Sequence, residues 1–118
     1  MAKFLFVYRN SADQAAHQPS PEEMQAIMGQ WGEWFQTLGE GLVDGGDALL
    51  PTGSQVASDG AVTDGPFIEA KELVGGFSIV QADDYAAAVE MAKSCPVIAG
   101  GGSVEVRETA GFAENNPQ

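Results

Sequence analysis

Few residues of this 118-residue chain could carry acid–base or nucleophilic chemistry. His17 is the only histidine, and a lone histidine in a polar stretch is usually solvent-exposed and inert. As a general base it would need an orienting carboxylate, for which Asp13 is one choice. Cys95, the only cysteine, closes a predicted helix, where the dipole disfavours a thiolate and packing is the favoured role. The sequence therefore assigns no catalytic residue.

The densest group of functional side chains runs from Asp64 to Glu72. Asp64 can fold back onto its own backbone as an Asx-type turn, and Pro66 stiffens the chain after it. Glu69 and Lys71 add charges that either line a cleft or face water. A rigid structural loop is the alternative interpretation of the same pattern.

We hypothesise that this loop walls a small-molecule pocket between the first helix and the sheet. The two tryptophans in this set could equally belong to the core or to an interface. The candidate pocket residues are Tyr8, Trp31, Trp34, Asp64, Phe67, Glu69, Lys71 and Glu72.

Motifs for metals, phosphates and cofactors are missing from the sequence. One histidine and one cysteine make a poor ligand set, and the carboxylates lack EF-hand spacing. The glycines at 100–102 precede a predicted strand and not a helix, so they form no phosphate-binding turn. We expect no metal and no cofactor.

The charge balance is strongly acidic, with a net charge of −12 and five basic residues scattered along the chain. Nucleic-acid binding needs clustered Lys and Arg, and anionic membrane surfaces repel an acidic chain, so neither partner is expected. The apolar run 1–8 is too short for a signal peptide or a membrane span, and a single cysteine needs no oxidising compartment. We expect a cytoplasmic protein.

The clearest predicted helix begins after Ser20. This residue suits the N-cap, Pro21 the first helical position, and Glu23 completes a capping box. Its apolar stripe has helical spacing and ends near Gly39 or Gly41. Two internal glycines, at 29 and 32, are expected to permit close contact with the sheet. The stripe consists of Met24, Ile27, Met28, Trp31, Phe35 and Leu38.

Strands are predicted at 3–8, 42–50, 75–82 and 103–107, with an extra hairpin at 54–63 that turns at Asp59-Gly60. Gly45-Gly46 indicates a bulge. A second helix is predicted to begin with Asp83 as its cap and to be limited by Pro96. One domain over 1–110 and a polar tail over 111–118 complete the interpretation.

This order predicts an α+β, ferredoxin-like βαββαβ fold with an inserted hairpin and a four-stranded antiparallel sheet. Both helices then cover the same face of the sheet. Because the strand at 3–8 is apolar on both sides, the other face needs a cover. We predict a homodimer through that sheet face.

The run Thr63-Asp64-Gly65-Pro66-Phe67-Ile68-Glu69-Ala70-Lys71-Glu72, followed by Gly75-Gly76-Phe77, resembles the signature of the DGPF branch of the YCII-related family. Weaker matches are the segments 20–24, 95–96 and 102–107. The resemblance implies a dimeric α/β barrel. Some relatives carry a histidine at the first helix and an aspartate at the end of the second, but segments 21–24 and 93–96 contain neither here.

Two functions stay open at this point. The favoured one is a non-catalytic dimeric interaction or regulatory module, because no complete catalytic set is present. The alternative is a lyase- or isomerase-like enzyme that binds a small molecule in a cleft beside the Asp64–Glu72 loop, with carboxylates and Lys71 supplying acid–base chemistry. A closed pocket favours the second, and a filled interior favours the first.

Overall fold

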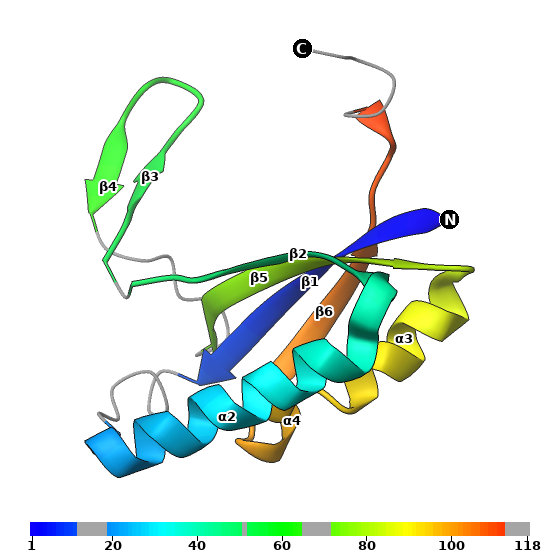
Figure 1. Cartoon of the computed structure of the whole chain (residues 1–118). Coiled ribbons are helices and arrows are strands. Elements are labelled where there is room, and N and C mark those ends of the chain that lie inside the picture. The colour runs from blue at the N-terminus through cyan, green and yellow to red at the C-terminus, as the bar shows by residue number, and fades with distance from the viewer. Residues whose placement is uncertain (12–18, 51, 65–71, 113–118) are drawn as a thin grey trace.

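The structure is a computed structural model that describes residues 1–11, 19–50, 52–64 and 72–112 (Figure 1). A sheet and a separate hairpin account for its strands, and the helices gather on one side of the sheet. The elements are β1 (Ala2–Ser11), α2 (Pro21–Leu38), η1 (Gly39–Gly41), β2 (Leu42–Ala48), β3 (Ser54–Val56), β4 (Val62–Asp64), β5 (Glu72–Ala82), α3 (Tyr85–Lys93), α4 (Pro96–Ala99) and β6 (Ser103–Glu108).

The main sheet has the strand order β2-β5-β1-β6, and each neighbouring pair is antiparallel. The first strand therefore lies inside the sheet, between the third and the last of its strands. This arrangement confirms the predicted α+β, ferredoxin-like fold with a four-stranded antiparallel sheet. Strands β3 and β4 form the predicted extra hairpin outside that sheet.

Helix α2 begins and ends where its capping residues predict. The Ser20 hydroxyl accepts a hydrogen bond from the Glu23 backbone N–H, and the Glu23 carboxylate accepts one from the Ser20 N–H. At the other end Gly39 takes a φ of 54°, which a glycine adopts without strain. The helix runs along the sheet and extends beyond it at its N-terminal end (Figure 1).

The core lies between the helices and the even-numbered residues of β1. Phe4 and Phe6 are fully buried, and Val80 joins them from β5. Ala88 and Ala92 of α3 pack against this layer because small side chains let the helix come close. The predicted cap of α3 is wrong by one residue: Asp84, not Asp83, is the N-cap, and its carboxylate accepts from the Ala87 N–H.

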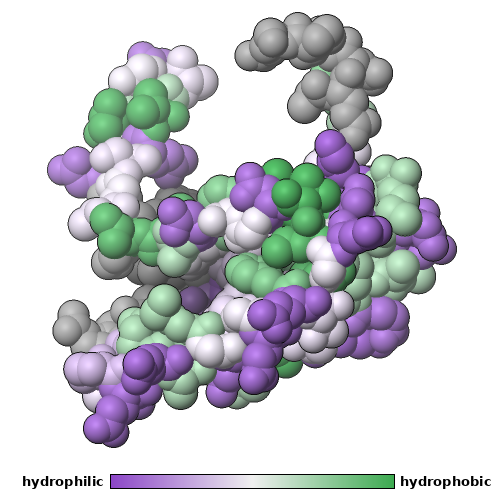
Figure 2. All heavy atoms as spheres, viewed as in Figure 1, coloured by the Kyte–Doolittle hydropathy of each residue, from purple (hydrophilic) through white to green (hydrophobic). Residues whose placement is uncertain are grey.

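The opposite face of the sheet, which we call the open face, carries no helix (Figure 1). Leu5 and Val7 lie on it, directly opposite Ile79 and Phe77 of β5. The aromatic side chains of β1 thus face the helices, and aliphatic side chains face outward. In Figure 2 hydrophobic residues gather along this upper edge of the body and on the hairpin, above more polar helices.

The hairpin projects from the sheet on the side of the open face (Figure 1). Its paired residues Val56 and Val62 are 67% and 63% exposed, so they have little cover within the chain. The predicted two-residue turn is wrong: the Ala57 N–H donates to the Ala61 carbonyl, which leaves a three-residue loop. Gly60 supplies its positive φ of 90°.

Candidate functional site

One end of the helix face of the sheet is rich in glycine and offers few side chains for packing. Gly45 of β2 and Gly75 and Gly76 of β5 line it and form a glycine floor, in which Gly76 pairs with Ala48 of β2. The backbones run close together at this point, and a Cβ on Gly76 would come within 2.8 Å of the Asp47 carbonyl oxygen. Larger residues are therefore excluded by the strand pairing itself.

The N-terminal half of α2 roofs this floor. Met24, Ile27 and Met28 belong to the predicted apolar stripe, and they are 43%, 40% and 66% exposed. They remain exposed because the glycine floor offers few side chains to meet them. The space between floor and roof, which we call the cleft, has a volume of about 470 Å³.

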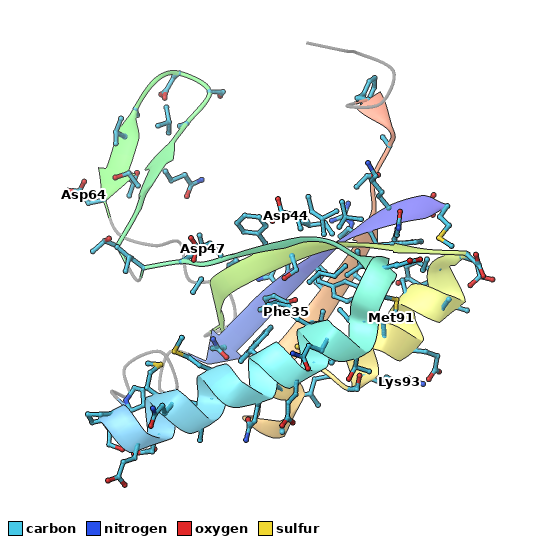
Figure 3. The ribbon with its side chains drawn as sticks, viewed as in Figure 1. Phe35, Asp44, Asp47, Asp64, Met91 and Lys93 are labelled. Carbon is cyan, nitrogen blue, oxygen red and sulfur yellow. The ribbon has the colours of Figure 1, made fainter. Side chains whose placement is uncertain are left out.

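An aromatic cluster closes the inner end of the cleft. The ring centroids of Tyr8 and Trp31 lie 4.8 Å apart in an edge-to-face arrangement, and those of Trp31 and Phe35 lie 5.8 Å apart. Phe35 points from α2 toward the sheet (Figure 3). Edge-to-face contacts of this kind fix ring orientations, so the inner wall is rigid.

A buried hydrogen-bond chain joins this wall to the floor. The Tyr8 hydroxyl donates to Ser78 Oγ at 2.8 Å, and Ser78 Oγ donates to the Gly45 carbonyl at 2.7 Å. Burial raises the pKa of the Tyr8 phenol far above its ordinary value, so the group stays neutral at physiological pH. These hydrogen bonds fix the bulge in β2. Tyr8 forms part of the wall, and because it is not ionised it cannot act as a general base.

A second hollow of about 510 Å³ lies between α2 and α4. It shares Asn10, Ile27, Trp31 and Val97 with the cleft, so Trp31 and Asn10 stand at the boundary of the two spaces. Together they form one two-lobed, mainly apolar depression. Such depressions with few polar groups are the usual form of a small-molecule site.

The Asn10 side chain reaches across the end of the sheet between two glycines. A Cβ on Gly75 would lie 2.7 Å from its Nδ2, and a Cβ on Gly102 would lie 2.9 Å from its Oδ1. Within the described residues this amide makes no hydrogen bond. It is therefore held by shape, and its polar atoms stay available to another molecule.

The structure separates the sequence-predicted pocket residues. Tyr8 and Trp31 line the cleft, whereas Trp34 is buried and lies beside another groove. Asp64 is exposed on the hairpin (Figure 3), and Glu72 begins β5 opposite Ser11. The other members of that set, Phe67, Glu69 and Lys71, lie outside the described residues. His17 and the carboxylate considered as its partner, Asp13, lie outside them as well.

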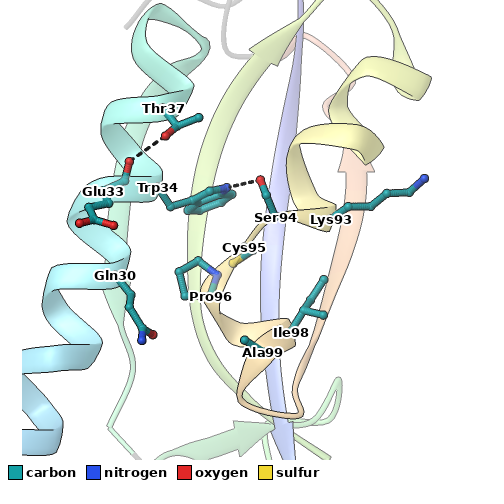
Figure 4. A pocket seen from close by; sticks show the side chains of 10 residues that line it. All are labelled: Gln30, Glu33, Trp34, Thr37, Lys93, Ser94, Cys95, Pro96, Ile98 and Ala99. Atoms are coloured by element: carbon teal, nitrogen blue, oxygen red, sulfur yellow. Dashed lines mark hydrogen bonds between the residues drawn. The ribbon is translucent and has the colours of Figure 1, made fainter.

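The groove beside Trp34 runs between α2, α3 and α4 and has a volume of about 520 Å³ (Figure 4). Its indole N–H already has partners, since Trp34 Nε1 donates to Ser94 Oγ at 3.0 Å and to the Met91 carbonyl at 3.3 Å. Cys95 is 2% exposed, and burial raises the pKa of its thiol to about 11. This thiol packs, as predicted, and is protonated at neutral pH, so the cleft is the better site.

Asn10 and the glycine floor are the functional features that the sequence did not reveal. Gly45 lies on β2, Gly76 on β5 and Gly102 directly before β6, and only the strand register brings them to one end of the sheet. The double glycines at 45–46 and 75–76 were the local signals, because a paired glycine in a strand marks a bulge or a close approach.

Metal binding finds no support in the described ranges, where no group of three or more His, Cys, Asp or Glu side chains converges. Among these residues no helix is long and apolar enough to cross a membrane.

Comparison with known proteins gives a family and no named relative. A search of curated proteins finds no match. The family model of the YCII-related domain matches residues 3–112, which include every strand and helix described above except Ala2 at the start of β1. By this match over nearly its whole length, the chain belongs to the YCII-related family.

Proposed function

We propose that this protein binds a small, uncharged, largely apolar molecule in the cleft between α2 and the glycine floor. The observation that carries the proposal is the pairing of the glycine floor with a roof of exposed apolar residues. Leaving this apolar roof beside an empty floor forgoes packing energy that a filled interior would supply. A site kept open at that cost is best explained by a ligand.

Binding, rather than catalysis, is the activity this lining supports. Tyr8 is held neutral by burial and already donates to Ser78, so it supplies neither a base nor a free donor. Trp31 and Phe35 give flat, apolar surfaces that suit a ring compound. The alternative of a lyase or isomerase would need an acid–base pair beyond these residues.

A matched pair of glycine substitutions tests the proposal. Gly32 lines the cleft and Gly29 does not, yet both lie in α2 and a Cβ added to either would have no other atom within 4 Å. We expect Gly32→Leu to fill the cleft and Gly29→Leu to leave it open. The probe is N-phenyl-1-naphthylamine, an uncharged dye that fluoresces in apolar sites.

The wild-type protein and Gly29→Leu should show a saturable rise in dye fluorescence, and Gly32→Leu should lose it. Equal dye binding by both variants would place the dye elsewhere and refute the cleft as the site. Absence of dye binding by the wild-type protein would refute it as well. Circular dichroism on each variant verifies that α2 is intact.

The charges of the open face favour a second proposal, that the protein acts as a homodimer. Three of the chain's five basic residues lie there on β1 and β6, together with three acids on β2 and β6. This balance occurs in a chain of net charge −12, so the open face can meet a second copy with little repulsion. The charged residues of this face are Lys3, Arg9, Arg107, Asp44, Asp47 and Glu105.

The dimer is tested by placing a charge at the centre of the open face. Val7→Glu should convert a sedimenting dimer to a monomer, because Val7 lies between Phe77 and Glu105 on the open face. Met28→Glu, on the exposed side of α2, is the matched control and should remain dimeric. A wild-type protein that sediments as a monomer at micromolar concentration would exclude this assembly.

A further inference from the structure

We propose that Asn10 donates a hydrogen bond to a carbonyl oxygen of the ligand, so that the cleft selects uncharged ring compounds that carry a ketone or a similar carbonyl group. This inference rests on the proposed function, because it names the chemistry that the same cleft recognises.

The position of the Asn10 amide supports this assignment. Nδ2 lies on the Gly75 side, and Oδ1 lies on the Gly102 side. Gly75 lines the cleft and Gly102 does not, so Nδ2 is the amide atom nearer to a lining residue of the cleft. A ligand in the cleft would meet this N–H group.

The rigidity of the amide supports the assignment further. Asn10 follows the bulge at Tyr8/Arg9, where β5 inserts Gly75 as its extra residue. With glycines on both flanking strands, the side chain fits a slot that any larger residue would close. A donor fixed in this way loses little conformational entropy when it binds.

The described lining of the cleft offers no charge that would favour an ionic ligand. Asp47 borders the cleft, but its place opposite Phe77 in the strand register puts its side chain on the open face, away from the helices (Figure 3). No other charged residue lines the cleft in the described part of the chain. A carboxylate ligand would lose its hydration without gaining a cation, and an ammonium would lose its hydration without gaining an anion.

Hydrogen bonding to a neutral group sets the expected size of the preference. One such bond contributes about 0.5 to 1.5 kcal/mol, which is roughly two- to tenfold in affinity. Removing the donor should therefore abolish a preference of about fivefold for a ligand with a carbonyl group over the same ring system without it. The apolar contribution to binding should stay unchanged.

The experiment uses 1-tetralone and tetralin, which share a fused ring system and differ in one carbonyl oxygen, together with the anion 1-naphthoate. Dissociation constants come from titrations followed by protein NMR on the full chain. We expect the wild-type protein to bind 1-tetralone about fivefold more tightly than tetralin and to bind 1-naphthoate weakest. The Asn10 side-chain NH₂ resonances should shift with 1-tetralone and not with tetralin.

Two substitutions complete the test. Asn10→Asp keeps the shape and removes the donor, and Asn10→Leu removes both polar atoms; in each the preference for 1-tetralone should disappear. If a variant fails to fold, the shift of the wild-type Asn10 NH₂ resonances still tests the hydrogen bond. Equal affinity of the wild-type protein for the two neutral probes would refute the role of Asn10. If Gly32→Leu then binds neither probe, the cleft remains the binding site. Failure of every probe to bind would refute the cleft too.

Discussion

The two ends of the same helix-covered sheet face are built in opposite ways. At one end, Phe4, Phe6 and Val80 are fully buried beneath α3 and the C-terminal half of α2. At the other end, Gly45 and Gly76 face exposed methionines across the cleft. The same strands continue through both ends, so the difference lies in the side chains, in the strand bulges at the cleft end and in α3, which covers only the packed end.

This contrast shows how a small domain can hold both a core and a site in one layer. Burial at the packed end supplies the stability, since each large apolar side chain contributes about 1.5 to 3 kcal/mol. The glycine floor contributes almost none of it. The site therefore depends on the packed end for its rigidity, through the stacked contact of Phe6 with Trp34 and the contact of Trp34 with Trp31.

The largest expected effect compares one substitution at each end. Phe6→Ala should lower the free energy of unfolding by about 3 to 5 kcal/mol, because it leaves a cavity in the packed end. Met28→Ala should change it by less than about 0.5 kcal/mol, since that side chain is mostly exposed. Urea denaturation measures both, and similar losses would mean that the cleft is closed in solution.

The next effect concerns the hydrogen-bond chain that links the two ends. Ser78→Ala leaves the Tyr8 hydroxyl and the Gly45 carbonyl without their partner, and it should cost about 1 to 3 kcal/mol. The double variant Ser78→Ala with Tyr8→Phe should lose less free energy of unfolding than the two single variants lose together. Strict additivity in this double-mutant cycle would show that the hydrogen bonds do not couple wall and floor.

A smaller effect, of opposite sign, is expected in the roof. Gly29→Leu and Gly32→Leu should each raise the free energy of unfolding by about 0.5 to 1 kcal/mol, because leucine favours a helix more than glycine does. Thermal melts of both variants give the comparison. A loss of stability in Gly32→Leu alone would mean that α2 approaches the floor more closely than the cleft allows.

The smallest effect is a pH dependence at the packed end. Because the pKa of the Cys95 thiol is raised to about 11 in the folded chain, its contribution to stability is complete below the ordinary thiol pKa and falls as the pH rises toward 11. The wild-type protein should therefore lose more stability between pH 8 and 11 than Cys95→Ala does. Parallel losses in the two proteins would contradict the burial of this thiol.

Local patterns in the sequence predicted the packed end well. Ser20, Pro21 and Glu23 place the start of α2 correctly, and the alternation in β6 identifies its inward residues, whereas β1 is apolar on both sides and its alternation does not. These signals act over a few neighbouring residues, so the sequence displays them directly. The fold class follows from their order.

The cleft could not be predicted in the same way. The stripe that includes Ile27 has helical spacing, but its burial depends on what the facing strands present. The expectation that Gly29 and Gly32 permit close helix–sheet contact is wrong, because neither has an atom within 4 Å of the place a Cβ would take. Side-chain spacing along one helix cannot show that three strands bring glycines to the same place.

The central position of β1 has a consequence for how the chain acquires its structure during synthesis. The first strand to leave the ribosome pairs with β5 and β6, whose residues follow it by 61 positions or more. Its hydrophobic side chains must therefore wait, unpaired, until most of the chain has been made. Long-range antiparallel pairing of this kind slows folding and prolongs the exposure of an aggregation-prone segment. Nascent-chain protection by a chaperone would matter most over this interval.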